Sequence, residues 1–408
     1  MGESLITRRA GAGGGGEATI TFDNYIGEGA VGYEFVGNWS IASEQLAGTS
    51  VGDYALFAGG WISFTYNSYV FAYDASLTVT MPTSLSQLRT NLAGASVGDY
   101  ALFAGGSYIS GSFIYTNNVD AYDLSLTHST PTTLSIGRHS LAGTSVGNYA
   151  LFAGGQAAST VASTVDAYDI NLSRTTPTSL SQARYTLVGT SVGNIALFAG
   201  GLISSSSYSA TVDAYDTALS RTTPTSLSQA RTELAGASVG NYALFAGGYV
   251  NSANNPLALV DAYDINLTRT TPSSLSEARY SLAGTSVGNA ALFAGGVPSA
   301  SSTSTTVDAY GYDLSHTILT SLSQGRRELA GASNRKYAIF AGGARTTNPE
   351  TPSAVNAYYQ YTRILLYPGT KYKFNDMTQE ETSTTGQELN VVSPVNGYMK
   401  IQNATVQN

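Results

Sequence analysis

The chain has 408 residues, of which 11% are charged, and its net charge is −8. Such an acidic chain lacks the basic surface that nucleic acids and anionic membranes attract, which argues against both as main partners. The absence of cysteine excludes disulfides, thiolate metal sites and cysteine nucleophiles, and the 28 tyrosines favour strands over helices.

Residues 1–16 are basic and rich in glycine, and they contain no apolar run of signal-peptide length. We expect a flexible tail on a chain that is synthesised in the cytoplasm without a signal peptide. A location outside the cell would then come from incorporation into a released particle. No run in the sequence is long enough to span a bilayer, so we expect no membrane insertion.

The segment Gly48–Gly52, GTSVG, matches the G-x-S-x-G pattern that presents a nucleophilic serine in many hydrolases. The same pattern begins again at five further positions, namely Gly94, Gly143, Gly189, Gly236 and Gly284. The chain has three histidines, which cannot partner six such serines. We therefore interpret the pattern as part of a repeated strand, and we predict no catalytic residues, no metal and no cofactor.

A unit of roughly 47 residues repeats along the chain, as internal self-similarity shows. Each unit holds the run ALFAGG or a close variant, and its glycine pairs begin at Gly59, Gly105, Gly154, Gly200, Gly247, Gly295 and Gly342. A V-x-x-Y-D segment follows, and an arginine closes the unit. All variation in length lies between the glycine pair and the valine. Stacked units with one free loop would produce this pattern.

Each unit predicts four strands. LAGTSV is the first, NYALFAGG the second and VDAYD the third, while TPTSLSQAR carries the fourth. The second strand is almost entirely apolar, so we expect it to be buried on both faces. Seven four-stranded units that close into a ring form a seven-bladed β-propeller, an all-β fold in which closure protects the sheet edges.

The order of these elements resembles the kelch repeat from about Trp39 to Tyr361. Kelch units usually carry a tryptophan in the last strand, whereas this chain has residues such as Thr130, Pro131 and Leu134 there, so the units are kelch-like. Some kelch-fold oxidases hold copper beside a cysteine-linked tyrosine, a site that a chain without cysteine cannot form. Sialate-mutarotase-like kelch enzymes use polar groups at the ring mouth, where no carboxylate stands out from this sequence.

The seventh unit lacks a fourth strand of the usual sequence. Residues 33–43 align with that strand, with Trp39 in the place of Leu85 and Ser43 in the place of Arg89. We predict that these residues form the outer strand of blade 7, the alternative being residues 364–367. The expected domains are a flexible tail at 1–16, the propeller at 17–366 and a small β appendage at 367–408.

Two sets of side chains are candidates for ligand binding, because second–third loops and fourth–first connections share one face of a propeller. The loops of blades 1 and 2 are rich in aromatic residues, namely Trp61, Phe64, Tyr66, Tyr69, Tyr108, Phe113 and Tyr115. These rings suit sugar stacking or a protein hot spot, unless they cover one another.

The second set consists of the closing arginines Arg89, Arg138, Arg184, Arg231, Arg279 and Arg326. They would form a ring of cations that binds anionic ligands. The alternative is that each arginine bonds backbone carbonyls and ties adjacent blades together. The aspartates of VDAYD, such as Asp120, are predicted to bond strands or turns.

We expect a non-catalytic binding or structural protein. Its Ser/Thr/Gly-rich composition, near-identical repeats and GAGGGG tail are similar to proteins of phage and prophage particles. That resemblance implies a tail- or fibre-type virion component, anchored through the N-terminal tail or the C-terminal appendage, that presents a propeller face to a host surface glycan or protein. The alternatives are a carbohydrate-active kelch-type enzyme and an intracellular kelch interaction scaffold.

Overall fold

The computed structural model describes residues 30–38, 43–62, 65–251, 255–299, 302–345 and 354–366, together with 371–372, 381–382, 387–392 and 400–405. The chain divides into two compact units, Tyr33–Tyr358 and a smaller unit that combines Met1–Gly32 with Tyr359–Asn408. Every regular element in the described ranges is a β-strand, which confirms the all-β prediction. None of these ranges contains a helix long and apolar enough to cross a membrane.

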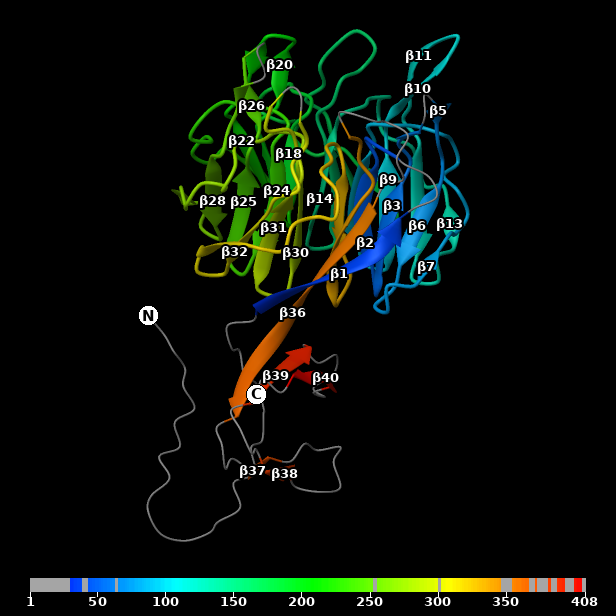
Figure 1. Cartoon of the computed structure of the whole chain (residues 1–408). Helices are drawn as coiled ribbons and strands as arrows, with labels where there is room; N and C mark the ends of the chain where they lie inside the picture. The colour runs from blue at the N-terminus through cyan, green and yellow to red at the C-terminus, as the bar shows by residue number, and fades with distance from the viewer. Residues whose placement is uncertain are drawn as a thin grey trace. The chain divides into compact units, whose positions relative to one another are not determined.

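The larger unit is a ring of seven antiparallel blades, as predicted (Figure 1). Blades 1 and 2 consist of β2 (Ala47–Val51), β3 (Tyr54–Ala58), β6 (Val70–Tyr73) and β7 (Val79–Thr80), then β8 (Ala93–Val97), β9 (Tyr100–Ala104), β12 (Val119–Asp123) and β13 (His128–Ser129). Blades 3 and 4 consist of β14 (Ala142–Val146), β15 (Tyr149–Ala153), β16 (Val165–Asp169) and β17 (Arg174–Thr175), then β18 (Val188–Val192), β19 (Ile195–Ala199), β22 (Val212–Asp216) and β23 (Arg221–Thr222).

The remaining blades repeat this construction. Blades 5 and 6 consist of β24 (Ala235–Val239), β25 (Tyr242–Ala246), β28 (Val260–Asp264) and β29 (Arg269–Thr270), then β30 (Ala283–Val287), β31 (Ala290–Ala294), β32 (Val307–Gly311) and β33 (His316–Ile318). Blade 7 combines β34 (Ala330–Ser333), β35 (Tyr337–Ala341) and β36 (Ala354–Leu366) with β1 (Ala30–Asn38), which pairs with β36.

The first strands of all blades meet at the centre of the ring, where β34 contacts β2. Their glycines make this approach possible, because a Cβ on Gly94 would lie 2.5 Å from the carbonyl oxygen of Gly48, and a Cβ on Gly48 would lie 2.5 Å from that of Gly331. The first glycine of the G-x-S-x-G pattern is therefore a packing residue. Ser50 lies within β2, opposite Ala55 of β3, and this supports its interpretation as a strand residue.

The core lies between the blades. Leu56 and Val70 of blade 1 pack with Phe103 and Tyr122 of blade 2, and all four are fully or almost fully buried. The Tyr122 hydroxyl donates a 2.8 Å hydrogen bond to the carbonyl of Thr83 in blade 1. The tyrosine of the V-x-x-Y-D segment therefore joins apolar burial to a polar link with the preceding blade.

The fourth strand is shorter and begins earlier than predicted. In blade 3 it is β17, Arg174–Thr175, which ends before the TPTSLSQAR segment. The backbone N–H groups of Leu180 and Arg184 in that segment bond the carbonyls of Ser163 and Ala162 in the second–third loop. Because these donors are used there, the segment does not extend the ladder, and it passes to the next blade as an irregular connection.

Ser43 occupies the position that an arginine takes elsewhere. The N–H of Gly343 in blade 7 donates to the Ser43 carbonyl at 2.7 Å, just as the N–H of Gly60 in blade 1 donates to the Arg89 carbonyl at 2.8 Å. Trp39 lies outside the described residues. Residues 364–366 pair with β39 (Gln387–Val392), which in turn pairs with β40 (Lys400–Thr405) in the smaller unit. That unit also contains the β37–β38 pair, Lys371–Tyr372 with Glu381–Thr382.

Candidate functional site

The closing arginines are buried inside the ring, so they do not form an open ring of cations. Their exposed fractions are 0%, or 1% for Arg326. Arg89 donates to the carbonyl of Phe103 at 3.1 Å and to the carboxylate of Asp120 at 2.6 Å, both in blade 2. The same pairing joins Arg138 to Asp166, Arg184 to Asp213, Arg231 to Asp261 and Arg279 to Asp308. These side chains tie adjacent blades together and are not available to a surface ligand.

The charges of these pairs compensate one another within the core. Burial lowers the pKa of Arg89, while Asp120 acts to raise it. Burial acts to raise the pKa of Asp120, but Arg89 and hydrogen bonds from Ser86 and His128 outweigh it, so this pKa lies below its usual value. The lowered pKa of Asp120 favours its ionised form beside the Arg89 guanidinium, as expected for a structural ion pair.

Two junctions depart from the pattern, and both involve blade 7. Arg326 donates to the neutral amide oxygen of Asn356 at 2.6 Å, and burial lowers the pKa of Arg326 to about 10. Between blades 7 and 1, Ser43 and Phe71 stand where the arginine and aspartate stand elsewhere. Neither junction of blade 7 therefore has an ion pair at these two positions, and the junction between blades 7 and 1 has no charged residue there.

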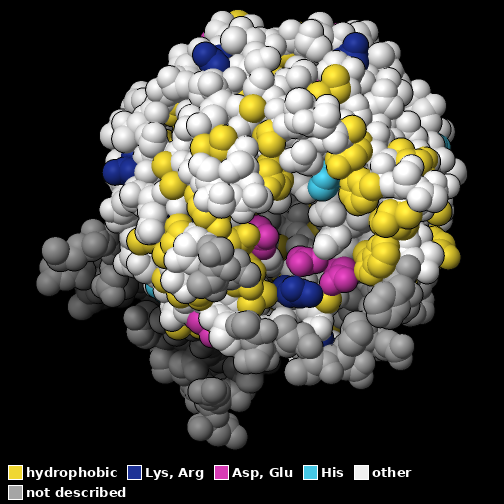
Figure 2. Space-filling view, turned by 90° about the horizontal axis from the view of Figure 1, so that it is seen from above, with side chains coloured by type: hydrophobic (Ala, Val, Ile, Leu, Met, Phe, Trp, Pro, Cys, Tyr) yellow, Lys and Arg dark blue, Asp and Glu magenta, His cyan; other side chains and the backbone are white. Residues whose placement is uncertain are grey.

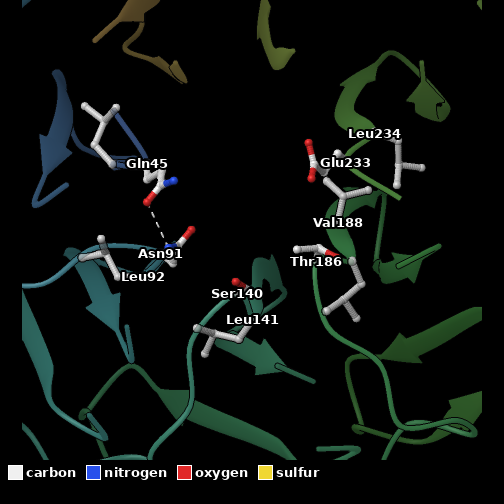
Figure 3. A pocket seen from close by; sticks show the side chains of 11 residues that line it. Gln45, Asn91, Leu92, Ser140, Leu141, Thr186, Val188, Glu233 and Leu234 are labelled. Atoms are coloured by element: carbon white, nitrogen blue, oxygen red, sulfur yellow. Dashed lines mark hydrogen bonds between the residues drawn. The ribbon is translucent and has the colours of Figure 1, made fainter. Parts of the chain in front are cut away.

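A polar ring surrounds the axis on the face that carries the second–third hairpins, the upper face in Figure 1. It consists of the residue two positions after each closing arginine or Ser43, namely Gln45, Asn91, Ser140, Thr186, Glu233, Ser281 and Glu328. These residues line two adjoining cavities of about 300 and 250 Å³. Leucines such as Leu92 and Leu234 alternate with them along the lining (Figure 3).

All seven ring residues have left-handed backbone conformations, with φ between 48° and 57°. This conformation is unusual without glycine, above all for a β-branched residue such as Thr186, and costs on the order of 1–3 kcal/mol per residue. Backbone hydrogen bonds between blades hold it in place, for example from Ser140 N to Asn91 O at 2.9 Å and from Thr186 N to Ser140 O at 2.8 Å. The backbone role is thus shared, while the side chains differ.

The polar ring is electrically uneven. Gln45 and Asn91 bond each other through their amides at 3.1 Å, so that side is neutral (Figure 3). On the other side, Glu233 accepts a short hydrogen bond from the Ser281 hydroxyl. Burial raises the pKa of Glu233, with Glu328 adding to the effect. Acidic side chains are visible around the central hollow of the upper face in Figure 2, with a basic side chain beside them.

The carboxylates at the ring mouth correct the sequence analysis, which found none there. Glu233 and Glu328 stand between an arginine-containing pair and a leucine, in RTEL and RREL. The signal that could have found them is the position itself, because its residue type changes between units while the leucine after it is kept. Sequence alone did not show that this position faces the axis.

The aromatic candidates of blade 1 lie on a short hairpin formed by β4 (Trp61–Ile62) and β5 (Thr65–Tyr66). Trp61 and Tyr66 pack edge to face with ring centres 4.5 Å apart, and both are half-buried. Tyr69 is 41% exposed, and Phe64 lies outside the described residues. The first aromatic pair thus covers itself in part, as the alternative interpretation held.

The candidates of blade 2 lie on a longer hairpin, β10 (Ser107–Ser110) with β11 (Ser112–Tyr115), which projects from the upper face in Figure 1. Phe113 is 45% exposed, although its ring lies 4.9 Å from Tyr115 and 5.5 Å from His139. Tyr108 is half-buried. This hairpin therefore presents apolar surface to solvent.

A second aromatic group, unrecognised in the sequence, lies over blades 4 to 6. The rings of Tyr208 and Tyr249 are 5.9 Å apart, and those of Tyr249 and Tyr280 are 4.9 Å apart. Tyr249 bonds the backbone of Thr232, the neighbour of Glu233. These half-buried tyrosines border the acidic side of the polar ring. They escaped notice because they come from different blades and from both loops and connections.

The comparisons with known proteins agree with the architecture. No family model and no curated protein matches the chain. Solved structures do match it, and one of them is described as "Structure of YjhT". Its identity is 11% and its TM-score 0.57, and the match covers 69% of this chain and 99% of that chain. A likeness at this identity shows the propeller fold alone, which is consistent with a binding or structural role.

Metal chemistry receives no support from the part of the chain that the structure describes. Within it, no three His, Cys, Asp or Glu side chains are grouped so that they could hold a metal ion. The polar ring instead offers carboxylates, amides and hydroxyls around a cavity, with aromatic hairpins beside it. A lining that combines leucines with a small number of polar groups is typical of a site for an organic ligand.

Proposed function

We propose that the propeller is a non-catalytic binding module of kelch-like type, carried by a phage or prophage particle, and that its upper face receives a host surface glycan. The observation that carries the proposal is the combination of a polar axial cavity with partly exposed aromatic hairpins on blades 1 and 2. Sugar rings stack on aromatic faces, and their hydroxyls need polar partners of the kind in the polar ring.

The particle assignment is supported by composition and repeat style. The glycine-rich residues 1–16 and the segment 367–408 are the proposed anchors to the particle. Because the repeats differ in length only in their second–third loops, the face that carries those loops is where one unit can acquire a function that the others lack. The aromatic residues of blades 1 and 2 are such a local difference.

The test is a pair of double variants in the full chain. We expect Trp61→Ala with Tyr108→Ala to weaken adsorption to host cells or binding on a glycan array by at least about 2 kcal/mol, the usual threshold of a hot spot. The matched control is Ser159→Ala with Ser206→Ala, two exposed serines in the polar loops of blades 3 and 4. Melting temperatures of both variants should stay close to that of the wild type.

Equal binding by the two double variants would refute the role of the hairpins. Adsorption that survives periodate oxidation of host glycans but not protease treatment of the cells would identify a protein receptor in place of a glycan. Failure of the chain to co-purify with a virion or tail complex would remove the particle assignment.

A second candidate function is a carbohydrate-active enzyme at the axial cavity. It is favoured by Glu233, whose pKa is raised by burial beside a second carboxylate, since glycoside chemistry uses a protonated and an ionised carboxyl group. The test is incubation of the protein with reducing sugars and oligosaccharides, followed by NMR. Turnover that disappears in Glu233→Gln would support the enzyme, and unchanged sugar spectra with the wild type would refute it.

A further inference from the structure

The residues that line the axial cavities carry negative charge without positive charge. Among the described lining residues are Glu233 and Glu328, and there is no arginine, lysine or histidine. The guanidinium of Arg327, which is not among the lining residues, lies 3.7 Å from one oxygen of Glu328. The other oxygen of Glu328 is buried and has no hydrogen-bond partner among the described residues. The acidic side of the cavity therefore holds unused acceptor capacity.

A further carboxylate lies just behind the polar ring. Glu44 precedes Gln45, and its Oε2 atom is also buried without a hydrogen-bond partner in the described part of the chain. Burial raises the pKa of Glu44, the charge of Glu328 adds to this effect, and Arg327 acts against it. On the neutral side, burial lowers the pKa of His139, so the imidazole of His139 adds no positive charge at pH 7. Glu44, Glu233 and Glu328 thus face the single guanidinium of Arg327, and this excess of carboxylates at the mouth favours a cationic guest.

Two tyrosines stand next to the acidic half of the polar ring without lining the cavities. The rings of Tyr249 and Tyr280 pack edge to face on each other with their centres 4.9 Å apart. On the opposite half, Gln45, Asn91 and Ser140 provide amides and hydroxyls that suit neutral hydroxyl groups. The cavity of about 300 Å³ is at the small end of ligand sites and suits a single ring.

We propose that the 300 Å³ cavity binds a sugar residue that carries a free, protonated amine, with its ammonium group at Glu233, next to Glu328 of the adjoining cavity, and its hydroxyls toward Gln45, Asn91 and Ser140. This rests on the proposed glycan-binding function and names the class of sugar. The aromatic hairpins of blades 1 and 2 would contact the residues of the glycan that follow. The blade 1 hairpin lies next to the polar ring, since the Trp61 N–H donates a 2.8 Å hydrogen bond to the carbonyl of Glu44, the residue before Gln45.

The experiment is calorimetric titration of the full chain with two probes that differ only in the amine. A glucosamine tetramer carries protonated amines, and the N-acetylglucosamine tetramer carries the same ring hydroxyls without charge. We expect the glucosamine tetramer to bind at least about tenfold more tightly, since a charge-assisted hydrogen bond is lost in the acetylated form. Glu233→Gln, which keeps the shape of the side chain, should reduce that affinity at least about tenfold.

Two further variants complete the design. Glu328→Gln should also weaken the glucosamine tetramer, and it serves as the second test if Glu233→Gln does not fold. Asp99→Asn is the control, because this exposed carboxylate lies in the β8–β9 turn, away from the residues that line the cavity. Its affinity should equal that of the wild type.

Equal affinity for both tetramers, or wild-type affinity in both glutamate variants, would overturn the proposal. The proposal would also be overturned if tetralysine bound as tightly as the glucosamine tetramer and lost the same affinity in Glu233→Gln, because the guest would then be a peptide. These outcomes are separate from failure of the proposed function. If the Trp61/Tyr108 double variant loses host adsorption while no amine preference is found, glycan binding stands and only the ammonium site is refuted.

Discussion

The buried pair of Arg89 and Asp120 can be tested against a junction that the protein itself builds differently. Between blades 7 and 1, Ser43 and Phe71 occupy the equivalent positions. The double substitution Arg89→Ser with Asp120→Phe therefore gives the junction between blades 1 and 2 the two residues found between blades 7 and 1. Each single substitution changes one side of that junction. A double-mutant cycle then measures how strongly the two side chains depend on each other.

The size of the effect follows from burial and from the number of bonds lost. Arg89 and Asp120 are both 0% exposed, and their charged atoms lie 2.6 Å apart. Asp120→Phe leaves the guanidinium without its carboxylate and also removes the acceptor of the Ser86 N–H at 2.7 Å. Removal of one partner of a buried pair costs about 3–5 kcal/mol. We expect each single variant to lose about this much stability, and the double variant to lose clearly less than the sum.

The assay is urea unfolding followed by circular dichroism, at pH 7 and in acid. The pKa of Asp120 lies below its ordinary value of 3.8, so the stability it contributes is fully present above that value and is lost as pH falls through the lowered pKa. The deficit of Asp120→Phe relative to the wild type should therefore shrink below about pH 3.8. Single-variant losses that add within about 0.5 kcal/mol in the double variant would refute the coupling.

Three further predictions concern the frame of the ring. Gly200→Val should lower stability by about a few kcal/mol or prevent folding. Gly200 has a φ of +67°, and a Cβ there would lie 2.8 Å from the Arg231 carbonyl oxygen. A melting curve like that of the wild type would contradict this prediction. Deletion of residues 1–43 should unfold or aggregate the ring, because it exposes the outer edge of blade 7. Deletion of residues 1–16 should leave the melting temperature unchanged. Equal behaviour of the two truncations on gel filtration would argue against closure by the N-terminal strand. Asn356→Asp should raise the melting temperature at pH 7, because it gives Arg326 a carboxylate partner. Among the described residues, Arg326 is the only closing arginine whose partner is a neutral amide. A lower melting temperature would show that the amide is needed.

The sequence by itself determined the number of blades, the order of strands within each blade and the loop that is free to vary. These features are local and repeated, so seven copies of one pattern report them with little dependence on the rest of the chain. The apolar run ALFA is buried as expected, as at Leu151 and Phe152. The fourth strand was placed wrongly, because its sequence bonds the neighbouring loop rather than the ladder.

Only the tertiary structure decided which residues face each other between blades. Arg89 meets Asp120 across a junction, and neither the spacing nor the residue types distinguish this buried pair from an exposed cation and a turn aspartate. The axial position of Glu233 likewise depends on a left-handed backbone, whose carbonyl accepts a 3.0 Å hydrogen bond from the Ser281 N–H of the next blade. A repeat shows what each blade is, whereas the axis exists only once seven blades have closed, so the polar cavity and its charge belong to the closed ring alone.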